Sequence, residues 1–186
     1  RGNLTRIEQW KVNSNYTENE LRYDNVGNVV MVIAHPDYYQ AETAYTYYDP
    51  PSDPDKYDYA YPWQTFSHPG PNVTLSTRTE YDLHTGLVTR TIDEANSDST
   101  VYEYDNMNRL IRVYQPNENV PAKIINYRDF ENPEAIIDST RFNATRWMVS
   151  KTYFDGFGRI IQTKRFDFEN NKTVVQNISY DGSGLR

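Results

Sequence analysis

Hydrophobic and polar residues alternate along several short segments of the chain, and turn-forming residues separate these segments. Residues 100–104 lead into one such turn, and residues 110–114 lead out of it toward Pro116. The same arrangement recurs at residues 149–153 and 160–164. Alternation with a period of two is typical of a β-strand with one buried face. The pattern therefore predicts antiparallel hairpins.

One turn sequence recurs along the chain: a tyrosine, an aspartate, a glycine or asparagine, and then an apolar pair. Such self-similarity indicates a repeat architecture. Residues 2–4 resemble the tail of a further copy. The residues expected to define the five turns are Tyr23, Asp24 and Gly27; Tyr81, Asp82 and Gly86; Tyr104, Asp105 and Asn108; Tyr153, Asp155 and Gly158; and Tyr180, Asp181 and Gly184.

The chemistry of a tight turn explains the spacing within each copy. The aspartate accepts hydrogen bonds from backbone N–H groups about two residues on, which favours a type I turn. The third residue after it must then adopt a positive φ to return the chain as a hairpin with a bulge. Gly27, Asn108, Gly158 and Gly184 stand at that position, and these residue types tolerate left-handed geometry. Gly86 comes one residue later, which predicts a loop longer by one residue.

The copies are unevenly spaced. The gaps from Asp24 to Asp82 and from Asp105 to Asp155 are about twice as long as the other two gaps. Each long gap is expected to contain a degenerate hairpin unit, with residues 45–49 and 124–129 as the candidates. Signals for helices are poor, and residues 132–137 could form at most a short turn.

Composition supports strands over disorder. Hydrophobic residues make up 37% of the chain, yet aromatic residues reach 15%, with 17 tyrosines. A disordered chain is depleted in aromatic residues, whereas tyrosine and threonine favour strands. We therefore predict an all-β fold in which antiparallel β-hairpin repeats form a continuous curved strip with little or no helix. Residues 1–186 are expected to be a single repeat segment from a longer array.

Charge and cysteine content exclude several classes of function. The net charge of −7 argues against nucleic acid and against an anionic membrane surface as partners. The chain has no cysteine, which excludes disulfides, thiolate zinc sites and cysteine nucleophiles. No apolar run approaches the ~20 residues of a membrane span. The first residues read as the middle of a longer chain, so we expect any targeting signal to belong to that parent.

The tyrosine-aspartate turns, each followed by glycine or asparagine and often by arginine, resemble the RHS/YD repeat family. Residues 62–66, 79–89 and 153–159 are closer still to the repeats in the B component of bacterial insecticidal toxin complexes. The resemblance covers most of the chain and is weakest over residues 37–61 and 118–141. It implies tandem hairpins that spiral into one β-strip, which in the toxins closes into a shell around a C-terminal toxin segment. Teneurin-type adhesion proteins use a similar shell.

This chain departs from the family pattern in ways that bear on its role. It is far too short to close a shell, and it has no recognisable RHS core motif or C-terminal toxin. We therefore expect a stretch of wall from a secreted or cell-surface parent. Its expected partners are the remaining repeats and the C-terminal segment of that parent, with other toxin-complex subunits or glycans as further candidates.

Two sets of polar residues are candidates for metal ligands. His35, His68 and His84 are far apart in sequence and beside turn residues, so we interpret them as exposed loop histidines. Asp53, Asp55 and Asp58 could hold calcium, but prolines interrupt the cluster and the glycine and closing glutamate of an EF-hand are missing. A proline-stiffened connection is the favoured interpretation, so no metal or cofactor is expected.

The remaining candidates also have a structural interpretation. The aromatic residues between Tyr38 and Phe66 could stack on sugars, but rings that alternate along strands more often pack across a sheet. Arg109 and Arg159 directly follow a turn residue and are expected to pair with Asp105 and Asp155 or with backbone carbonyls. Six glycosylation sequons begin at Asn3, Asn15, Asn72, Asn143, Asn171 and Asn177, and they matter only in a eukaryotic source.

No constellation of residues points to catalysis, because the motifs for a serine nucleophile, a phosphate loop and a zinc hydrolase are missing. The sequence therefore predicts a non-enzymatic, structural β-repeat wall that helps to enclose a C-terminal toxin segment. The alternative is an extracellular adhesion or carbohydrate-binding module, which the aromatic residues would serve.

Overall fold

A computed structural model describes residues 2–10, 16–35, 41–46, 60–70, 72–167 and 172–181. These residues form 14 β-strands and no helix, so the predicted all-β fold of antiparallel hairpins is confirmed. None of them forms a helix long and apolar enough to cross a membrane.

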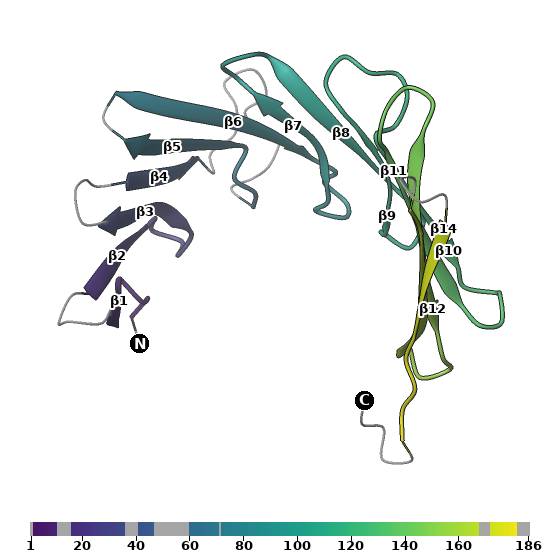
Figure 1. Cartoon of the computed structure of the whole chain (residues 1–186). Coiled ribbons are helices and arrows are strands. Elements are labelled where there is room, and N and C mark those ends of the chain that lie inside the picture. The colour runs from purple at the N-terminus through teal and green to yellow at the C-terminus, as the bar shows by residue number, and fades with distance from the viewer. Residues whose placement is uncertain are drawn as a thin grey trace. The chain divides into compact units, whose positions relative to one another are not determined.

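The chain divides into two units, residues 1–100 and 101–186, and the boundary falls within β8. In each unit the strands lie side by side in the order of the sequence (Figure 1). The strands of the first unit are β1 (Arg6–Trp10), β2 (Tyr16–Tyr23), β3 (Val29–His35), β4 (Ala41–Thr46), β5 (Gln64–Gly70), β6 (Val73–Tyr81) and β7 (Val88–Asp93).

The strands of the second unit, which begins within β8, also follow one another as a meander (Figure 1). Its strands are β8 (Asp98–Tyr104), β9 (Leu110–Tyr114), β10 (Lys123–Arg128), β11 (Ala135–Arg141), β12 (Trp147–Phe154), β13 (Ile160–Asp167) and β14 (Lys172–Asn177). Each of the two candidate degenerate units, residues 45–49 and 124–129, overlaps the end of an even-numbered strand. β4 ends within residues 45–49, and β10 ends at Arg128, directly before Asp129.

The strand register shows a bulge at the end of each tyrosine-aspartate hairpin. The pairing shifts by one residue at the last position of β2, β6, β8 and β12. An extra residue of this kind accompanies a turn that ends in a left-handed residue, and it increases the local twist of the two strands. The bulged pairs are Tyr23↔Val29, Tyr81↔Val88, Tyr104↔Leu110 and Phe154↔Ile160.

Deep burial is scarce among the described residues. Ile33 and Ala135 are the buried hydrophobic side chains, with 3% and 5% of their surface exposed, and no large side chain is fully buried. Most strand residues are half-buried. Stability must therefore come largely from cross-strand pairs and turn hydrogen bonds, which contribute in small increments along the sheet.

Candidate functional site

Four turns share one hydrogen-bonding pattern centred on an aspartate. The Oδ1 atom of Asp105 accepts the backbone N–H of Met107 at 2.9 Å and that of Arg109 at 2.9 Å. Asp155 accepts the N–H groups of Phe157 and Arg159 at the same distances. In the first unit Oδ1 of Asp24 accepts the N–H groups of Val26 and Asn28, and Oδ1 of Asp82 accepts those of His84 and Thr85, two and three residues on. The side chain thus replaces hydrogen bonds that the backbone cannot make inside a tight turn.

Each of these turns also contains a residue with positive φ, which is +97° at Gly27, +72° at Gly86, +62° at Asn108 and +74° at Gly158. The N–H of Gly27 donates to the carbonyl of Asp24 three residues earlier, whereas that of Gly86 donates to Asp82 four residues earlier. The loop after Asp82 is therefore one residue longer, as its sequence predicts.

The turn aspartates of the second unit bind the arginine that closes the turn. The Nε and Nη2 atoms of Arg109 both lie 2.8 Å from Oδ2 of Asp105. Arg159 binds Asp155 with the same two distances. The expected pairing of these arginines with the turn aspartates is therefore present. A two-pronged contact of this kind holds the guanidinium in one orientation beside the turn.

Hydrogen bonds at the turns explain the acidity of the aspartates. The backbone N–H of Arg109 is the largest cause that lowers the pKa of Asp105, and the guanidinium of Arg109 lowers it further against the opposing effect of burial. Arg159 lowers the pKa of Asp155 in the same way. The turn carboxylates are therefore held in their charged form.

A tyrosine hydroxyl links successive hairpins at the same end of the strands. These tyrosines lie at or just after the end of an even-numbered strand. Each donates its O–H to a backbone carbonyl at or just before the start of the preceding odd-numbered strand. The sequence separations are 17 to 20 residues. The pairs are Tyr23 with Leu4 at 2.6 Å, Tyr81 with Pro62 at 2.9 Å, Tyr127 with Leu110 at 3.2 Å and Tyr180 with Ile160 at 2.9 Å.

In the second unit the turn arginine of one hairpin also lies over the tyrosine of the next. The guanidinium carbon of Arg109 is 4.0 Å from the ring centroid of Tyr127, and that of Arg159 is 4.4 Å from Tyr180. Both distances are within the range of cation–π attraction. We call the aspartate, arginine and tyrosine that meet in this way the clasp.

The clasp of Arg109 includes a second carboxylate. Nη1 and Nη2 of Arg109 lie 2.9 Å from the two carboxylate oxygens of Asp129, which follows β10. Hydrogen bonds from Arg109 to Asp129 and then to Asp105 raise the pKa of the guanidinium. Its donors are therefore used within the protein, and the arginine is not free to bind a substrate anion.

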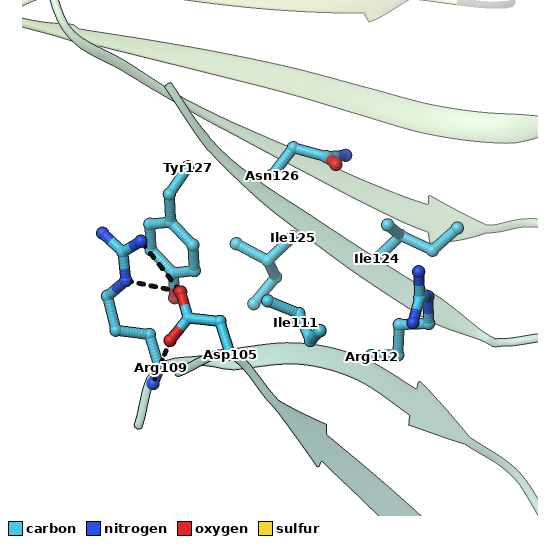
Figure 2. Close-up of a pocket in the computed structure, with 8 residues that line it drawn as sticks. All are labelled: Asp105, Arg109, Ile111, Arg112, Ile124, Ile125, Asn126 and Tyr127. Atoms are coloured by element: carbon cyan, nitrogen blue, oxygen red, sulfur yellow. Dashed lines mark hydrogen bonds and ion pairs between the residues drawn. The ribbon is translucent and has the colours of Figure 1, made fainter. Parts of the chain in front are cut away.

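A shallow pocket of about 180 Å³ lies beside this clasp (Figure 2). Figure 2 shows the Asp105 carboxylate, the Arg109 guanidinium and the Tyr127 ring grouped at one side of it. Ile111, Ile124, Ile125, Asn126 and Arg112 line the remainder. The pocket lies between β9 and β10, and Asp105, Arg109 and Tyr127 of its lining are already bound to one another in the clasp, so its geometry supports a structural role.

The first unit joins its hairpins with different groups. Asn28 takes the place of the arginine and donates from Nδ2 to Oδ2 of Asp24 at 3.0 Å. Tyr61 stacks on Tyr81 with ring centroids 4.9 Å apart and planes 20° apart. It directly precedes Pro62, whose carbonyl binds the Tyr81 hydroxyl. The tyrosine hydroxyl bond is therefore common to both units, whereas the group that covers the tyrosine ring varies.

One expected turn residue occupies a different position. Phe154, rather than Tyr153, directly precedes Asp155 and pairs with Ile160, as Tyr104 pairs with Leu110. Tyr153 pairs with Gln162 one step earlier. An additional residue between tyrosine and aspartate produces this shift. Phenylalanine has no hydroxyl to donate, and here its backbone N–H binds the carbonyl of Glu134 at 2.9 Å.

The last predicted turn is only partly described. The ring of Tyr180 takes part in the clasp of Arg159, and Asp181 follows as an exposed residue. Gly184 lies outside the described residues.

Sequence reasoning missed two turns on the opposite end of the strands. Asn143 accepts the N–H groups of Thr145 and Arg146 at 3.0 and 2.9 Å, so an asparagine performs the role of the turn aspartate. Asp93 accepts the N–H of Ala95 at 2.9 Å, and Ser97 has a φ of +59°. Neither turn follows a tyrosine, which is why the repeat pattern did not reveal them. An Asx residue between alternating segments was the available signal.

The histidines and acidic residues form no metal centre in the described parts of the chain, where no group of three potential ligands lies together. His84 is exposed in a turn, as expected. His68 lies in β5, and its buried Nδ1 atom has no hydrogen-bond partner, so the prediction of an exposed loop histidine is wrong there. His35 lies in β3. Asp53, Asp55 and Asp58 lie outside the described residues.

The aromatic candidates are only partly described. Tyr45, Tyr61, Trp63 and Phe66 are half-buried, and the stacking of Tyr61 on Tyr81 is packing within the sheet. The other tyrosines of this run lie outside the described residues; they are Tyr38, Tyr39, Tyr47, Tyr48, Tyr57 and Tyr59.

Comparison with known families gives a match to the last part of the chain. A family model described as a domain of unknown function, DUF6443, matches residues 126–186. This segment begins in β10 and contains the turn of Asp155, Arg159 and the tyrosine Tyr180. None of the curated proteins matches the chain. The last third of the chain is therefore similar to a family for which no activity is described.

Proposed function

We propose that this chain is a stretch of RHS/YD-type repeat wall whose function is structural. The observation that carries the proposal is the repeated link between hairpins, in which a tyrosine hydroxyl binds a backbone carbonyl 17 to 20 residues earlier in the chain. The link occurs four times along the described residues, and a recurring link of this kind is suited to extending a sheet by addition of further units. The role needs neither catalysis nor a cofactor.

The wall is proposed to belong to a secreted or cell-surface protein and to help enclose a C-terminal toxin segment of the same parent chain. The mechanism is steric, because a sheet of paired hairpins separates the enclosed segment from proteases. The turn carboxylates and the clasp arginines fix the geometry at one end of the strands. The partners of this chain are then its neighbouring repeats and the segment they surround.

Limited proteolysis of the full-length parent tests the enclosure. Mass spectrometry would follow the C-terminal segment while the wall remains intact. We expect the segment to survive as long as the wall does. The matched control is the parent with Gly158→Val, in which strain at a turn should open the wall and expose the segment. Digestion of the segment in the intact parent as fast as the free peptide would disprove enclosure.

Adhesion or carbohydrate binding is a second candidate, and exposed rings at the hairpin tips favour it. Phe157 in the turn after β12 is 87% exposed, and Phe130 after β10 is fully exposed. Flat apolar rings in solvent are suited to stacking on sugars. Binding of the chain to a glycan array, lost in Phe157→Ser and Phe130→Ser but kept in Met107→Ser, would support this candidate over enclosure.

A further inference from the structure

Two lysines of the second unit lie directly opposite one another. Lys151 on β12 pairs with Lys164 on β13 in the strand register, so both side chains project from the same face of the sheet. Like charges at directly opposed positions repel each other and destabilise the pairing. The arrangement therefore requires an explanation in a chain that carries an excess of acidic residues.

Several other charged pairs of the sheet are complementary. Glu103 pairs with Arg112, and their side chains are 2.8 Å apart. Glu80 pairs with Arg90 at 3.8 Å. The register also sets Arg6 opposite Glu20.

A second like-charged pair lies between β1 and β2, and there the protein supplies a counter-ion. Glu8 lies opposite Glu18, and Nη2 of Arg6 binds the two carboxylates at 2.5 and 3.0 Å. A single cation thus neutralises two opposed anions. The lysine pair is the inverse case, and a single anion between the two ammonium groups would neutralise it.

No carboxylate of the described residues takes that position. Along the row of opposed residues, Ile137 flanks Lys151 and Val175 flanks Lys164. The next positions on the same face of β12 and β13 are Val149, Tyr153, Gln162 and Phe166, and none is acidic. Lys164 Nζ lies 5.0 Å from the ring centroid of Tyr153, which orients its ammonium group without neutralising it.

We propose that Lys151 and Lys164 form a binding site for an oxyanion, such as a carboxylate or a phosphate, that comes from outside the described residues. Lys151 is exposed and every residue of β14 is exposed, so the site is open to solvent. The flanking Tyr153, Ile137 and Val175 bring no competing carboxylate to the two ammonium groups. This inference does not depend on the proposed wall function.

Thermal unfolding of the whole chain tests the site with two probes, inorganic phosphate and a hexapeptide of glutamate, each compared with chloride at equal ionic strength. At about ten times the Kd of a probe, Tm should rise by roughly 3–6 °C. A rise with both probes indicates a general oxyanion site. A rise with phosphate alone identifies a free ion as the bound oxyanion, and a rise with the peptide alone identifies an acidic peptide. Each of these three results supports the site.

Charge variants assign the effect to the lysine pair. Lys151→Gln should abolish the rise, and Lys151→Glu should abolish it while raising Tm without any probe, because the opposed pair becomes complementary. Lys123→Gln is the matched control, since Lys123 is already bound to Asp138 at 2.7 Å. The proposal is overturned if neither probe raises Tm above chloride, or if Lys123→Gln removes as much of the rise as Lys151→Gln.

Discussion

The turns of the two units solve one structural problem with different side chains. In the second unit an arginine binds the turn aspartate and covers the tyrosine of the next hairpin. In the first unit Asn28 binds the turn aspartate, and a tyrosine ring, Tyr61, covers Tyr81. The aspartate and the left-handed residue are the same in both, and these two features define the turn. A tyrosine hydroxyl bond joins neighbouring hairpins in both units, and the group that covers the tyrosine ring can be charged or aromatic.

The difference has a physical consequence for stability. A guanidinium between carboxylates depends on charge and is weakened by salt and by acid. Stacked tyrosines depend on buried apolar area and on ring geometry, which salt and acid hardly affect. The arginine clasps of the second unit should therefore be weakened by salt and acid, whereas the stacked pair of the first unit should respond to changes of shape; the turn aspartates of both units titrate.

The largest effect is expected from adding a methyl group at Gly86. A Cβ atom there would lie 2.6 Å from the hydroxyl oxygen of Tyr61, and φ is +72°. Backbone strain and loss of the stacked pair together should lower the free energy of unfolding by roughly 2–4 kcal/mol. Urea unfolding of Gly86→Ala measures this. A loss no greater than that of Gly156→Ala would contradict the stacking of Tyr61 at this turn.

The second prediction isolates backbone strain in the second unit. A Cβ atom added at Gly158 or at Gly156, in the same turn, would meet open space, but only Gly158 has a positive φ, of +74°. Gly158→Val should lower the free energy of unfolding by roughly 1–3 kcal/mol. Gly156→Val should cost about 0.5 kcal/mol or less. Equal urea midpoints for the two variants would refute the turn assignment.

A smaller effect is expected from the tyrosine hydroxyl. Tyr127→Phe removes the bond to the carbonyl of Leu110 and keeps the ring under Arg109. Loss of one hydrogen bond should lower the free energy of unfolding by about 0.5–1.5 kcal/mol. Tyr114→Phe is the control, because the Tyr114 hydroxyl has no hydrogen bond within the described residues. Equal effects of the two variants on the urea midpoint would argue against the hydroxyl link.

The smallest effect at neutral pH, and the one most specific to charge, is acid sensitivity. The pKa values of Asp24, Asp82, Asp105 and Asp155 are lowered in the folded chain. The folded state therefore binds fewer protons than the unfolded state near the ordinary aspartate pKa of about 3.9. Their contribution to stability is fully present above that pH and is lost as pH falls through the folded values.

Tm should therefore decrease as pH is lowered from about 5 to below 3. Asp105→Asn with Asp155→Asn should flatten this decrease, because two of the responsible groups no longer titrate. A Tm that stays constant or rises over this range would show that the turn carboxylates are not held in their charged form.

The sequence predicted the turns better than the links between them. Aspartate and a following glycine or asparagine act within five residues, so Asp105 and Asn108 could be assigned from local chemistry alone. The bond from Tyr127 to Leu110 joins residues 17 positions apart and depends on the strand register, which alternation alone does not determine. The role of Asp129 in the clasp could not be predicted for the same reason.

Two other differences follow from treating the repeat as a fixed pattern. In the segment Tyr153-Phe154-Asp155 one residue separates the tyrosine from the aspartate. Because the aspartate determines where the turn begins, Phe154 rather than Tyr153 occupies the position directly before the turn. Asn143 forms an aspartate-like turn without a preceding tyrosine, since only its side-chain oxygen is required. The hydrogen-bonding chemistry of a turn is thus a better guide to its position than the full motif.

A double-mutant cycle tests most directly whether the clasp joins consecutive hairpins. Arg109→Gln and Tyr127→Leu would be made singly and together. The control cycle combines Tyr127→Leu with Arg165→Gln, because Arg165 lies on β13. If the clasp is a real link, the double variant loses less Tm than the sum of the two single losses, while the control pair is additive. Additive losses for Arg109 and Tyr127 would contradict the account.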